Sequence, residues 1–393
     1  MDKIKFLDLG RQPIANRFLN EDEFENEFFY NLSVGFDQDT GLVTQMDYVD
    51  APMMFNDEYA YRGSMSKTMR DHFAKFSKYF KDNIHRSPKV LEIGSNDGVF
   101  IKNWNKKTTF AVEPCGNFAQ ETNDMGYETY AQFWDIDTSS EILEDQGKMD
   151  LVFSANCMCH IPDLDGTFKA TENILADDGL FIFEDPSLER MVNLNSYDQI
   201  YDEHPHVFSV TALQNILNRN NLSVVKVEKL EVHGGSNRIY VKKTNKANED
   251  TSVEDNLTLE RHMGLDKLSV LDDFAEKVHT SKNDLLNILT RLKNENKKVI
   301  SYGATSKSAT IFNYCQIGSE LIQYITDTTP EKQGKYSPGM HIPIITPEEG
   351  FNNSVDCAFL GAWNFADEIK NKENEYISRG GKFITHVPIL RFI

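Results

Sequence analysis

The sequence predicts an α/β protein built around two parallel sheets. The prediction rests on two series of alternating strand-like and helix-like segments. In each series, short apolar runs alternate with segments of helical periodicity. Such alternation is typical of a doubly wound parallel sheet with helices on both faces. The strands of the first series are expected near residues 89–93, 109–113, 150–155 and 180–184.

The second series predicts a Rossmann-like domain in the C-terminal part of the chain. It has a single glycine, Gly303, at its first strand-to-helix turn, so we expect no dinucleotide there. Its strands are expected near residues 299–304, 322–327, 342–345, 357–362 and 382–385.

The segments before and after the first series have other patterns. Residues 1–70 have weak periodicity and many aromatic residues, which indicates a small, irregular, strand-rich module. A helix is expected at about 69–80. After the first series, two adjacent strands at 224–228 and 238–241 are expected to form an antiparallel hairpin added to the sheet.

The segment between the two series predicts a linker followed by one long helix. Residues 243–252 are polar and poor in apolar side chains, as in a linker. Apolar residues then recur at helical spacing, which predicts a single amphipathic helix over about 260–294. The chain therefore divides into an N-terminal module (1–70), a central domain (71–245) and a C-terminal domain (246–393).

Composition and charge exclude several classes of function. The 393-residue chain has a net charge of -20, so a nucleic-acid partner is not expected. Its N-terminus resembles neither a signal peptide nor a membrane span, and we expect no membrane association. Nothing in the sequence excludes a monomer, so we expect a monomer or a weak homo-oligomer.

The cysteines indicate a reducing compartment. Their spacing forms no disulfide framework, which predicts free thiols and a cytoplasmic protein. Cys157 and Cys159 are two positions apart, which is not the C-x-x-C spacing of metal sites, and no metal is expected there. The five residues are Cys115, Cys157, Cys159, Cys315 and Cys357.

The turn after the first strand predicts a nucleoside cofactor. Gly94 and Gly98 bracket this turn and allow the backbone to approach a ligand closely. Glu113, at the end of the next strand, has the spacing of an acid that holds ribose hydroxyls. The turn is not G-x-G-x-x-G, which disfavours NAD, whereas a polar, acidic turn suits the cationic amino-acid end of S-adenosylmethionine (SAM). The expected cofactor-binding residues are Glu92, Gly94, Asn96, Asp97, Gly98, Glu113, Pro114 and Asn156.

Three segments near the ends of later strands are candidates for catalysis. His160 follows the third strand and is either a site residue or a loop histidine before a proline turn. The segment from Tyr201 to His204 offers a base, an orienting carboxylate and a phenol, or is a solvated helix end. His233, with two glycines after it, either approaches a ligand or belongs to a hairpin turn that needs glycines.

The C-terminal series offers a candidate anion pocket. The turn from Ser301 to Lys307 leads into a helix, and helix N-termini hold phosphates. Lys332 and Lys335 add two cations, so the group is suited to a nucleotide diphosphate.

At this point the motifs of the chain resemble those of the SAM-dependent sugar C-methyltransferases, which add a methyl group at C-3 of nucleotide-linked 4-keto deoxysugars. The resemblance extends over nearly the whole chain and includes residues 6–16, 92–98, 156–163, 201–204, 233–238, 302–307, 313–315 and 332–339. It implies a class I SAM methyltransferase domain, and a C-terminal Rossmann-like domain that contributes to nucleotide-sugar binding.

The resemblance also implies roles for individual residues. His204 matches the proposed base of the family, with Tyr201 and Glu203 beside it and His160 across the pocket. An N-terminal tyrosine that reaches into the site is Tyr59 or Tyr61, and we place Tyr61 among the catalytic candidates. The substrate-binding candidates are Tyr59, His233, Ser236, Arg238, Tyr302, Lys307, Lys332 and Lys335.

The chain departs from the family at two places. Members carry an N-terminal zinc site made of two C-x-x-C pairs, but here Asp37 and Thr40 stand where the second pair belongs, and the first pair is absent. Since structural zinc needs four N/S-type ligands, we expect no metal in this module. Members also often have histidine at the position of Asp202.

The expected function is therefore SAM-dependent methylation at C-3 of a nucleotide-linked 4-keto deoxysugar through a base-generated enolate. Three alternatives remain at this stage: a SAM-dependent O-methyltransferase, a non-catalytic member that binds a nucleotide-sugar or a partner chain, and an NAD-dependent enzyme. The missing glycine fingerprint disfavours the last of these.

Overall fold

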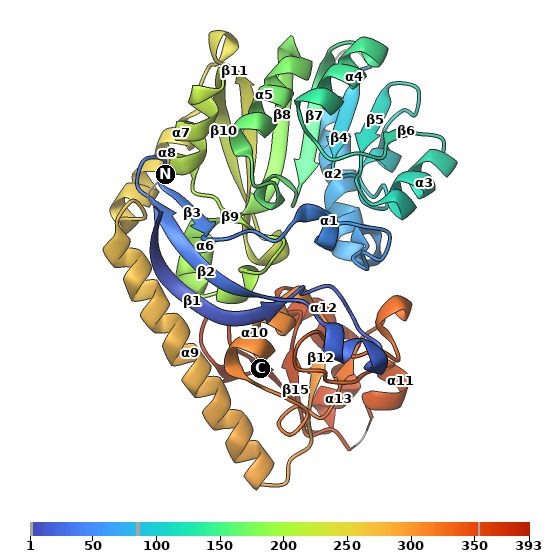
Figure 1. Ribbon diagram of the computed structural model, residues 1–393, viewed down its shortest axis with the longest axis vertical. Helices are drawn as coiled ribbons and strands as arrows, with labels where there is room; N and C mark the ends of the chain where they lie inside the picture. Colours follow the sequence, from blue (N-terminus) through green and yellow to red (C-terminus); the bar gives the residue numbers. More distant parts are fainter. Residues whose placement is uncertain (1–2, 84–86, 353) are drawn as a thin grey trace.

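The computed structural model describes residues 3–83, 87–352 and 354–393 and contains three sheets. Met1 and Asp2 lie outside the described residues. They begin the N-terminal segment that the sequence predicts not to be a signal peptide. The seven-stranded sheet forms the upper half of the molecule in Figure 1, the six-stranded sheet forms the lower half, and the N-terminal sheet lies between them.

The upper sheet has the strand order β10-β11-β8-β7-β4-β5-β6. Its central strands are parallel, and β11 inserts antiparallel between β8 and β10. This confirms the first predicted series and its late hairpin. The strands are β4 (Val90–Ile93), β5 (Thr109–Val112), β6 (Glu128–Tyr130), β7 (Met149–Ala155), β8 (Leu175–Pro186), β10 (Leu222–Leu230) and β11 (Ser236–Lys243).

Both faces of this sheet are buried under helices, as its apolar runs require. Val152 and Phe181 pack in one cluster with residues of α5 and α7, whereas Phe153 packs in another with Phe73 and Phe76 of α2. The helices around the sheet are α2 (Lys67–Asp82), α3 (Gly116–Asp124), α4 (Ile136–Gln146), α5 (Leu164–Ile174), α6 (Leu188–Leu194), α7 (Val210–Arg219) and α8 (Thr251–Met263).

The N-terminal sheet is antiparallel and has the order β1-β2-β3-β9. Its fourth strand comes from the central part of the chain, directly after the segment that contains His204. The N-terminal sheet is therefore joined to that segment through backbone hydrogen bonds. Its elements, with the short helix that follows β3, are β1 (Lys3–Pro13), β2 (Phe29–Asp37), β3 (Leu42–Gln45), β9 (His206–Val207) and α1 (Ala51–Met54).

The lower sheet has the order β14-β13-β12-β15-β16-β17, with all neighbours parallel except β16 and β17. The second predicted series is thus confirmed as a Rossmann-like sheet. Its elements are β12 (Val299–Tyr302), α10 (Ser306–Cys315), β13 (Ile325–Thr326), β14 (Ile344–Ile345), α11 (Pro347–Gly350), β15 (Cys357–Leu360), α12 (Ala366–Lys372), α13 (Asn374–Ser378), β16 (Lys382–Thr385) and β17 (Arg391–Phe392).

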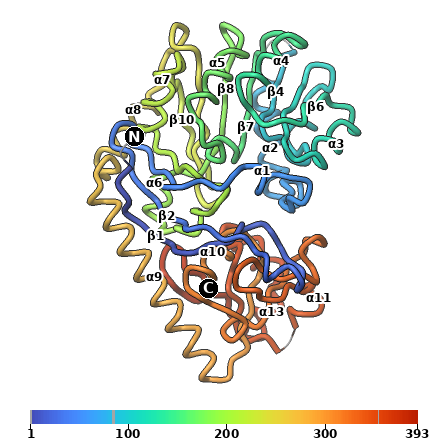
Figure 2. Tube along the Cα trace, in the orientation of Figure 1, coloured from blue at the N-terminus to red at the C-terminus, as the bar shows by residue number. Residues whose placement is uncertain are grey.

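The prediction of one helix over 260–294 is wrong, because residues 260–263 belong to α8 and a separate helix, α9 (Leu268–Asn294), follows. Gly264 ends α8 in the left-handed conformation, with φ +69°, which an L side chain rarely adopts. In Figure 2, α9 runs along one side of the molecule from the upper half to the lower half. α8 instead packs on β10 and α7. The division of the chain into domains at residues 70 and 245 stays a prediction.

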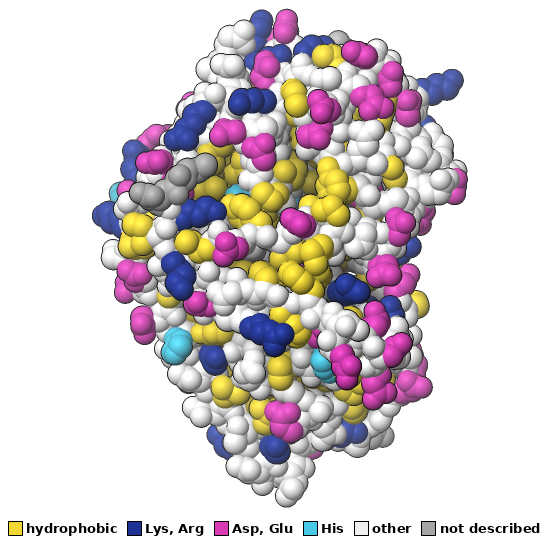
Figure 3. All heavy atoms as spheres, viewed as in Figure 1, with side chains coloured by type: hydrophobic (Ala, Val, Ile, Leu, Met, Phe, Trp, Pro, Cys, Tyr) yellow, Lys and Arg dark blue, Asp and Glu magenta, His cyan; other side chains and the backbone are white. Residues whose placement is uncertain are grey.

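A cavity of about 480 Å³ lies between the two halves, at the carboxyl ends of the parallel strands of both sheets. Ligands of open α/β sheets bind at these ends. On the face shown in Figure 3, hydrophobic side chains gather across the middle of the molecule, between the upper and lower halves. Among the described residues, none of the helices has the length and apolar character needed to span a membrane.

Candidate active site

His204 lies in the cavity with one ring nitrogen held by the backbone. Its Nδ1 is 2.7 Å from the carbonyl oxygen of Gln199, which fixes Nδ1 as the protonated nitrogen. Nε2 therefore carries the lone pair. Burial lowers the pKa of His204 well below its ordinary value, and His160 and Lys307 add to this effect. The ring is therefore neutral, and its Nε2 is unprotonated.

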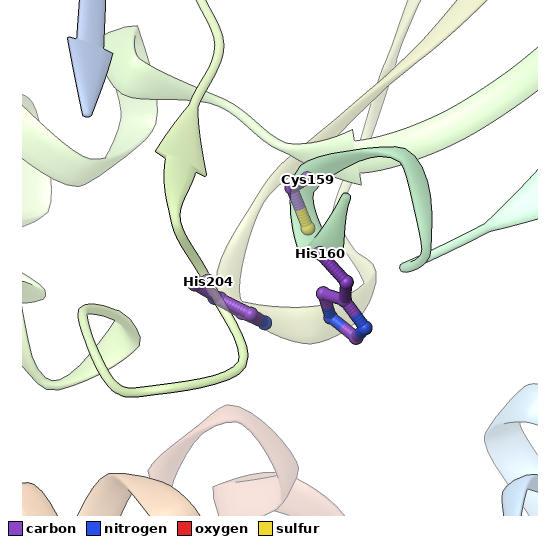
Figure 4. Close-up of side chains that lie close together, drawn as sticks. All are labelled: Cys159, His160 and His204. Atoms are coloured by element: carbon purple, nitrogen blue, oxygen red, sulfur yellow. The ribbon is translucent and has the colours of Figure 1, made fainter. Parts of the chain in front are cut away.

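Two aromatic rings lie against that of His204. The Tyr201 ring centroid is 4.0 Å away and the His160 ring centroid 5.0 Å away. His160 comes from the short helix after β7, and Figure 4 shows its ring beside that of His204. Burial lowers the pKa of His160 to about 3, so this ring is also neutral. The structure thus brings Tyr201, His160 and His204 together, as the sequence predicts.

Glu203 does not orient His204, contrary to the sequence-based expectation of an adjacent carboxylate. Its two oxygens accept hydrogen bonds from the Asn16 amide at 2.5 Å and from the Tyr59 hydroxyl at 2.8 Å. Successive side chains of an irregular segment point in different directions, and the carbonyl of Gln199 takes the orienting role. Burial raises the pKa of Glu203. The hydrogen bonds from Asn16 and Tyr59 lower this pKa, but their effect is smaller.

The N-terminal sheet holds the backbone of the same segment. The amide of Gln45 donates to the carbonyl oxygens of Tyr201 and His204, at 2.7 and 2.9 Å. The backbone N–H of Ala15 donates to Asp202 at 3.0 Å. Sequence reasoning missed Gln45 and Asn16, because both act through contacts with a segment far away in the chain. It also missed Gln199, because its backbone carbonyl and not its side chain contacts His204.

Both candidate N-terminal tyrosines line the cavity, but only Tyr59 donates to Glu203. Tyr61 is 40% exposed, and its carbonyl oxygen accepts a hydrogen bond from the Asn96 side chain at 3.0 Å. Tyr59 is therefore the tyrosine that reaches the segment containing Glu203 and His204, whereas Tyr61 lies nearer the expected cofactor.

One end of the cavity brings together most of the residues that the sequence predicts for SAM. Glu113 accepts the backbone N–H groups of Asn96 and Cys115, at 2.7 and 2.9 Å, at the end of β5. A Cβ at Gly94 would lie 2.7 Å from the thiol of Cys157, so only glycine fits there. Glu92 is buried with Oε2 unpartnered, and this carboxyl suits a cationic amino group. Pro114 and Asn156 line the same end, together with two aromatic residues that the sequence did not single out, Phe133 and Trp134.

Asp97 and Gly98 lie behind this surface and do not line the cavity. Asp97 accepts the backbone N–H of Ser64 at 3.2 Å and so holds the segment that crosses the cofactor end. Gly98, with φ +74°, packs against Thr122 of α3. The two residues therefore do not face the cofactor end as expected, and instead they hold neighbouring segments in place.

Of the eight substrate-binding candidates, five line the cavity: Tyr59, His233, Tyr302, Lys307 and Lys332.

The structure does not bring the other three to the cavity. Arg238 is buried in ion pairs with Glu184 (2.7 Å) and Glu228 (3.0 Å), because β11 points it toward α2. The Ser236 hydroxyl donates to the carbonyl of Val232. Lys335 lies in the turn before β14, outside the lining. Pattern alone could not show which face of its strand or turn each residue occupies.

Profiles of known families match most of the chain. A profile described as a putative zinc binding domain matches residues 1–55, a methyltransferase domain matches 61–227, and a C-methyltransferase C-terminal domain matches 231–388. C-methyltransferase NovU of Streptomyces niveus is 30% identical over 398 residues, which cover 100% of this chain and 94% of that protein. The chain belongs to the C-methyltransferase family. It is a SAM-dependent C-methyltransferase, and SAM is its cofactor.

Solved structures are less similar. A SAM-dependent methyltransferase from Clostridium acetobutylicum is 17% identical, with a TM-score of 0.34, over 46% of this chain and 93% of its own. A possible histamine N-methyltransferase from Thermotoga maritima is also 17% identical, with a TM-score of 0.34, over 45% of this chain and 91% of its own. At this level of similarity neither structure bears on the substrate.

The N-terminal residues do not fit the zinc ion that the matching profile names. Residues 1–71 contain neither cysteine nor histidine. The turn where the second cysteine pair would lie is closed by a 2.9 Å hydrogen bond from the Thr40 hydroxyl to Asp37, which also accepts the backbone N–H of Asp39. Hydrogen bonds to the Asp37 side chain close this turn.

Proposed function

We propose that this C-methyltransferase acts at C-3 of a nucleotide-linked 4-keto deoxysugar, with His204 as the general base. The observation that carries the proposal is the 2.7 Å contact from His204 Nδ1 to the Gln199 carbonyl, which leaves the Nε2 lone pair for the substrate. A neighbouring ketone makes the C-3 hydrogen acidic, and a positioned base then contributes roughly 10²–10⁴-fold to the rate.

In the proposed reaction, Nε2 of His204 takes the C-3 proton and the electrons of the C–H bond form an enolate. The enolate oxygen needs hydrogen-bond donors that are already in place. The Tyr201 hydroxyl suits this role, since it lines the cavity and makes no hydrogen bond to the described residues. His160 is the second candidate donor, because its Nε2 is buried without a partner. SAM, when bound, supplies the methyl group that C-3 receives.

The lower sheet supplies the proposed site for the nucleotide diphosphate. The first turn of α10, at Ser306 and Lys307, lines the cavity, and first-turn N–H groups have no partner within a helix. Lys307 lines the cavity, where Asp198 and Glu203 interact electrostatically with its ammonium group. Lys332 lies nearby, and its ammonium group donates to the Ala304 carbonyl at 2.8 Å. Two cations at a helix N-terminus favour a dianionic group in an otherwise acidic protein.

The test uses purified protein with SAM and a panel of nucleotide-linked 4-keto-6-deoxysugars deuterated at C-3. Mass spectrometry is expected to show a gain of one methyl group with loss of the deuterium. A methylated product that keeps the C-3 deuterium would overturn the proposal in favour of O-methylation. The matched control is the His204→Asn variant, which is expected to keep SAM binding in calorimetry and to lose both methylation and deuterium release.

A further inference from the structure

Three potential metal ligands converge beside the proposed base. The thiol of Cys159 and the rings of His160 and His204 place one ligand atom each within 4.8 Å of one another. Cys159 and His160 come from the short helix after β7, and His204 comes from the segment before β9 (Figure 4). The C-x-C spacing of Cys157 and Cys159 gave no reason to expect a metal here, because the third ligand comes from a distant part of the chain.

The surroundings of the two rings resemble those of metal-binding histidines. A metal-bound histidine nearly always donates its second ring N–H to a carbonyl or carboxylate. His204 donates Nδ1–H to the Gln199 carbonyl, so the lone pair on Nε2 faces the cluster. Nε2 of His160 is buried and has no hydrogen-bond partner among the described residues. This unpartnered atom is a second observation that points to a ligand.

The geometry suits an ion with an open coordination position. Zinc bound at about 2.0–2.1 Å from nitrogen and about 2.3 Å from sulfur separates its ligand atoms by roughly 3.5 Å. Ligand atoms within 4.8 Å of one another reach this arrangement by shifts of about 1 Å. His160 and His204 also line the cavity, so a fourth position would face the space where substrate binds.

We propose that Cys159, His160 and His204 form a binding site for Zn²⁺ or a similar divalent ion, and that the bound ion inhibits the enzyme. On binding, the S–H bond of Cys159 breaks, its electron pair forms the sulfur–metal bond, and the proton leaves to the solvent. The ion also takes the Nε2 lone pair of His204. The inhibition rests on the proposed role of His204 as base, whereas binding of the ion does not.

The binding test uses Co²⁺ as a probe, added to the full chain after chelation. Tetrahedral Co²⁺ with a thiolate ligand gives visible bands and a near-ultraviolet sulfur-to-cobalt band, and one equivalent of Zn²⁺ is expected to remove both. Cys159→Ala and the conservative Cys159→Ser are expected to lose the sulfur band. The matched control is Cys157→Ala, since Cys157 is the neighbouring thiol that lines the cavity, and this variant is expected to keep the band. Absence of the band in the unmodified chain, or its loss in the Cys157 variant alone, would overturn the proposal.

The inhibition test measures methyl transfer as Zn²⁺ is added, with activity restored by chelator. Cys159→Ser is expected to need at least ten times more Zn²⁺ for half inhibition, each protein being compared with its own uninhibited rate. A cobalt spectrum without zinc inhibition would keep the metal site and contradict His204 as the base. Inhibition of equal strength in both proteins would overturn the assignment of Cys159.

Discussion

Two regions of this chain differ in the ligands they offer a metal. The N-terminal module matches a profile named for zinc binding, yet its turn is closed by the hydrogen bond between Thr40 and Asp37. The active site matches a methyltransferase profile, yet it brings Cys159, His160 and His204 together. A family match therefore indicates a shared backbone fold. Whether a metal binds depends instead on the donor atoms at individual positions.

The two regions also use their polar side chains for different purposes, one for stability and the other for chemistry. In the N-terminal module, polar side chains close a turn through hydrogen bonds. In the candidate active site, His160 and His204 line the cavity, and the buried thiol of Cys159 lies beside them. Four predictions test this contrast.

The largest effect is expected at the base. His204→Asn should lower kcat by about 10²-fold or more, because the lone pair that accepts the proton is lost. Calorimetry should show unchanged SAM affinity. His206→Gln is a suitable control, since this buried histidine contacts Thr44 and the Pro162 carbonyl rather than the cavity. A larger loss in the control than in His204→Asn would contradict the assignment of the base.

A smaller loss of kcat is expected when the contact between the C-terminal domain and the segment that orients the base is removed. The Trp363 indole N–H donates to the fully buried Asp198 at 2.6 Å, next to Gln199, whose carbonyl holds His204. Trp363→Phe removes this donor, which costs about 1.5–3 kcal/mol for a charged acceptor. We expect kcat to fall about tenfold, on the order of 1.4 kcal/mol, with little change in KM for SAM. An effect on KM alone would show that the contact does not position the base.

In the N-terminal turn, Thr40→Val should affect stability rather than catalysis. It removes the hydroxyl that donates to Asp37 and accepts from the backbone N–H of Leu42. Chemical denaturation is expected to show a loss of about 1–2 kcal/mol in the free energy of unfolding. Methyl-transfer rates measured well below the melting temperature should stay close to those of the unmodified chain, and a large fall in rate would contradict this separation.

The smallest effect is expected from chelation. In the Cys159→Ser variant, which lacks the thiol of the active-site cluster, EDTA should leave the melting temperature unchanged. A zinc-dependent module unfolds when its metal is removed. A clear fall in melting temperature would therefore reveal a metal that the N-terminal residues do not account for.

Much of the fold could be predicted from the sequence because its signals are local. Alternating apolar runs and helical segments predict both parallel sheets, and Gly94 and Glu113 mark the cofactor end at adjacent strands. The break between α8 and α9 was missed, since apolar spacing continues past Gly264 and only its positive φ reveals the helix end.

The candidate site was predictable only in part. Tyr201, His204 and His160 are recognisable from motifs, and all three line the cavity. Arg238 lies in an equally recognisable motif but is used in buried ion pairs.

The sequence by itself determined the class of fold, the family and the residues able to act as a base, because these depend on residue type and local spacing. The tertiary structure alone decided that the Gln199 carbonyl orients His204, that Tyr59 rather than Tyr61 reaches Glu203, and that Cys159 faces both histidines. The physical reason is that hydrogen bonds and metal coordination depend on directions and separations of a few ångströms. Tyr59 and Glu203, and Cys159 and His204, come from distant segments and meet only when these pack together, whereas Gln199 and His204 meet through the fold of one irregular segment.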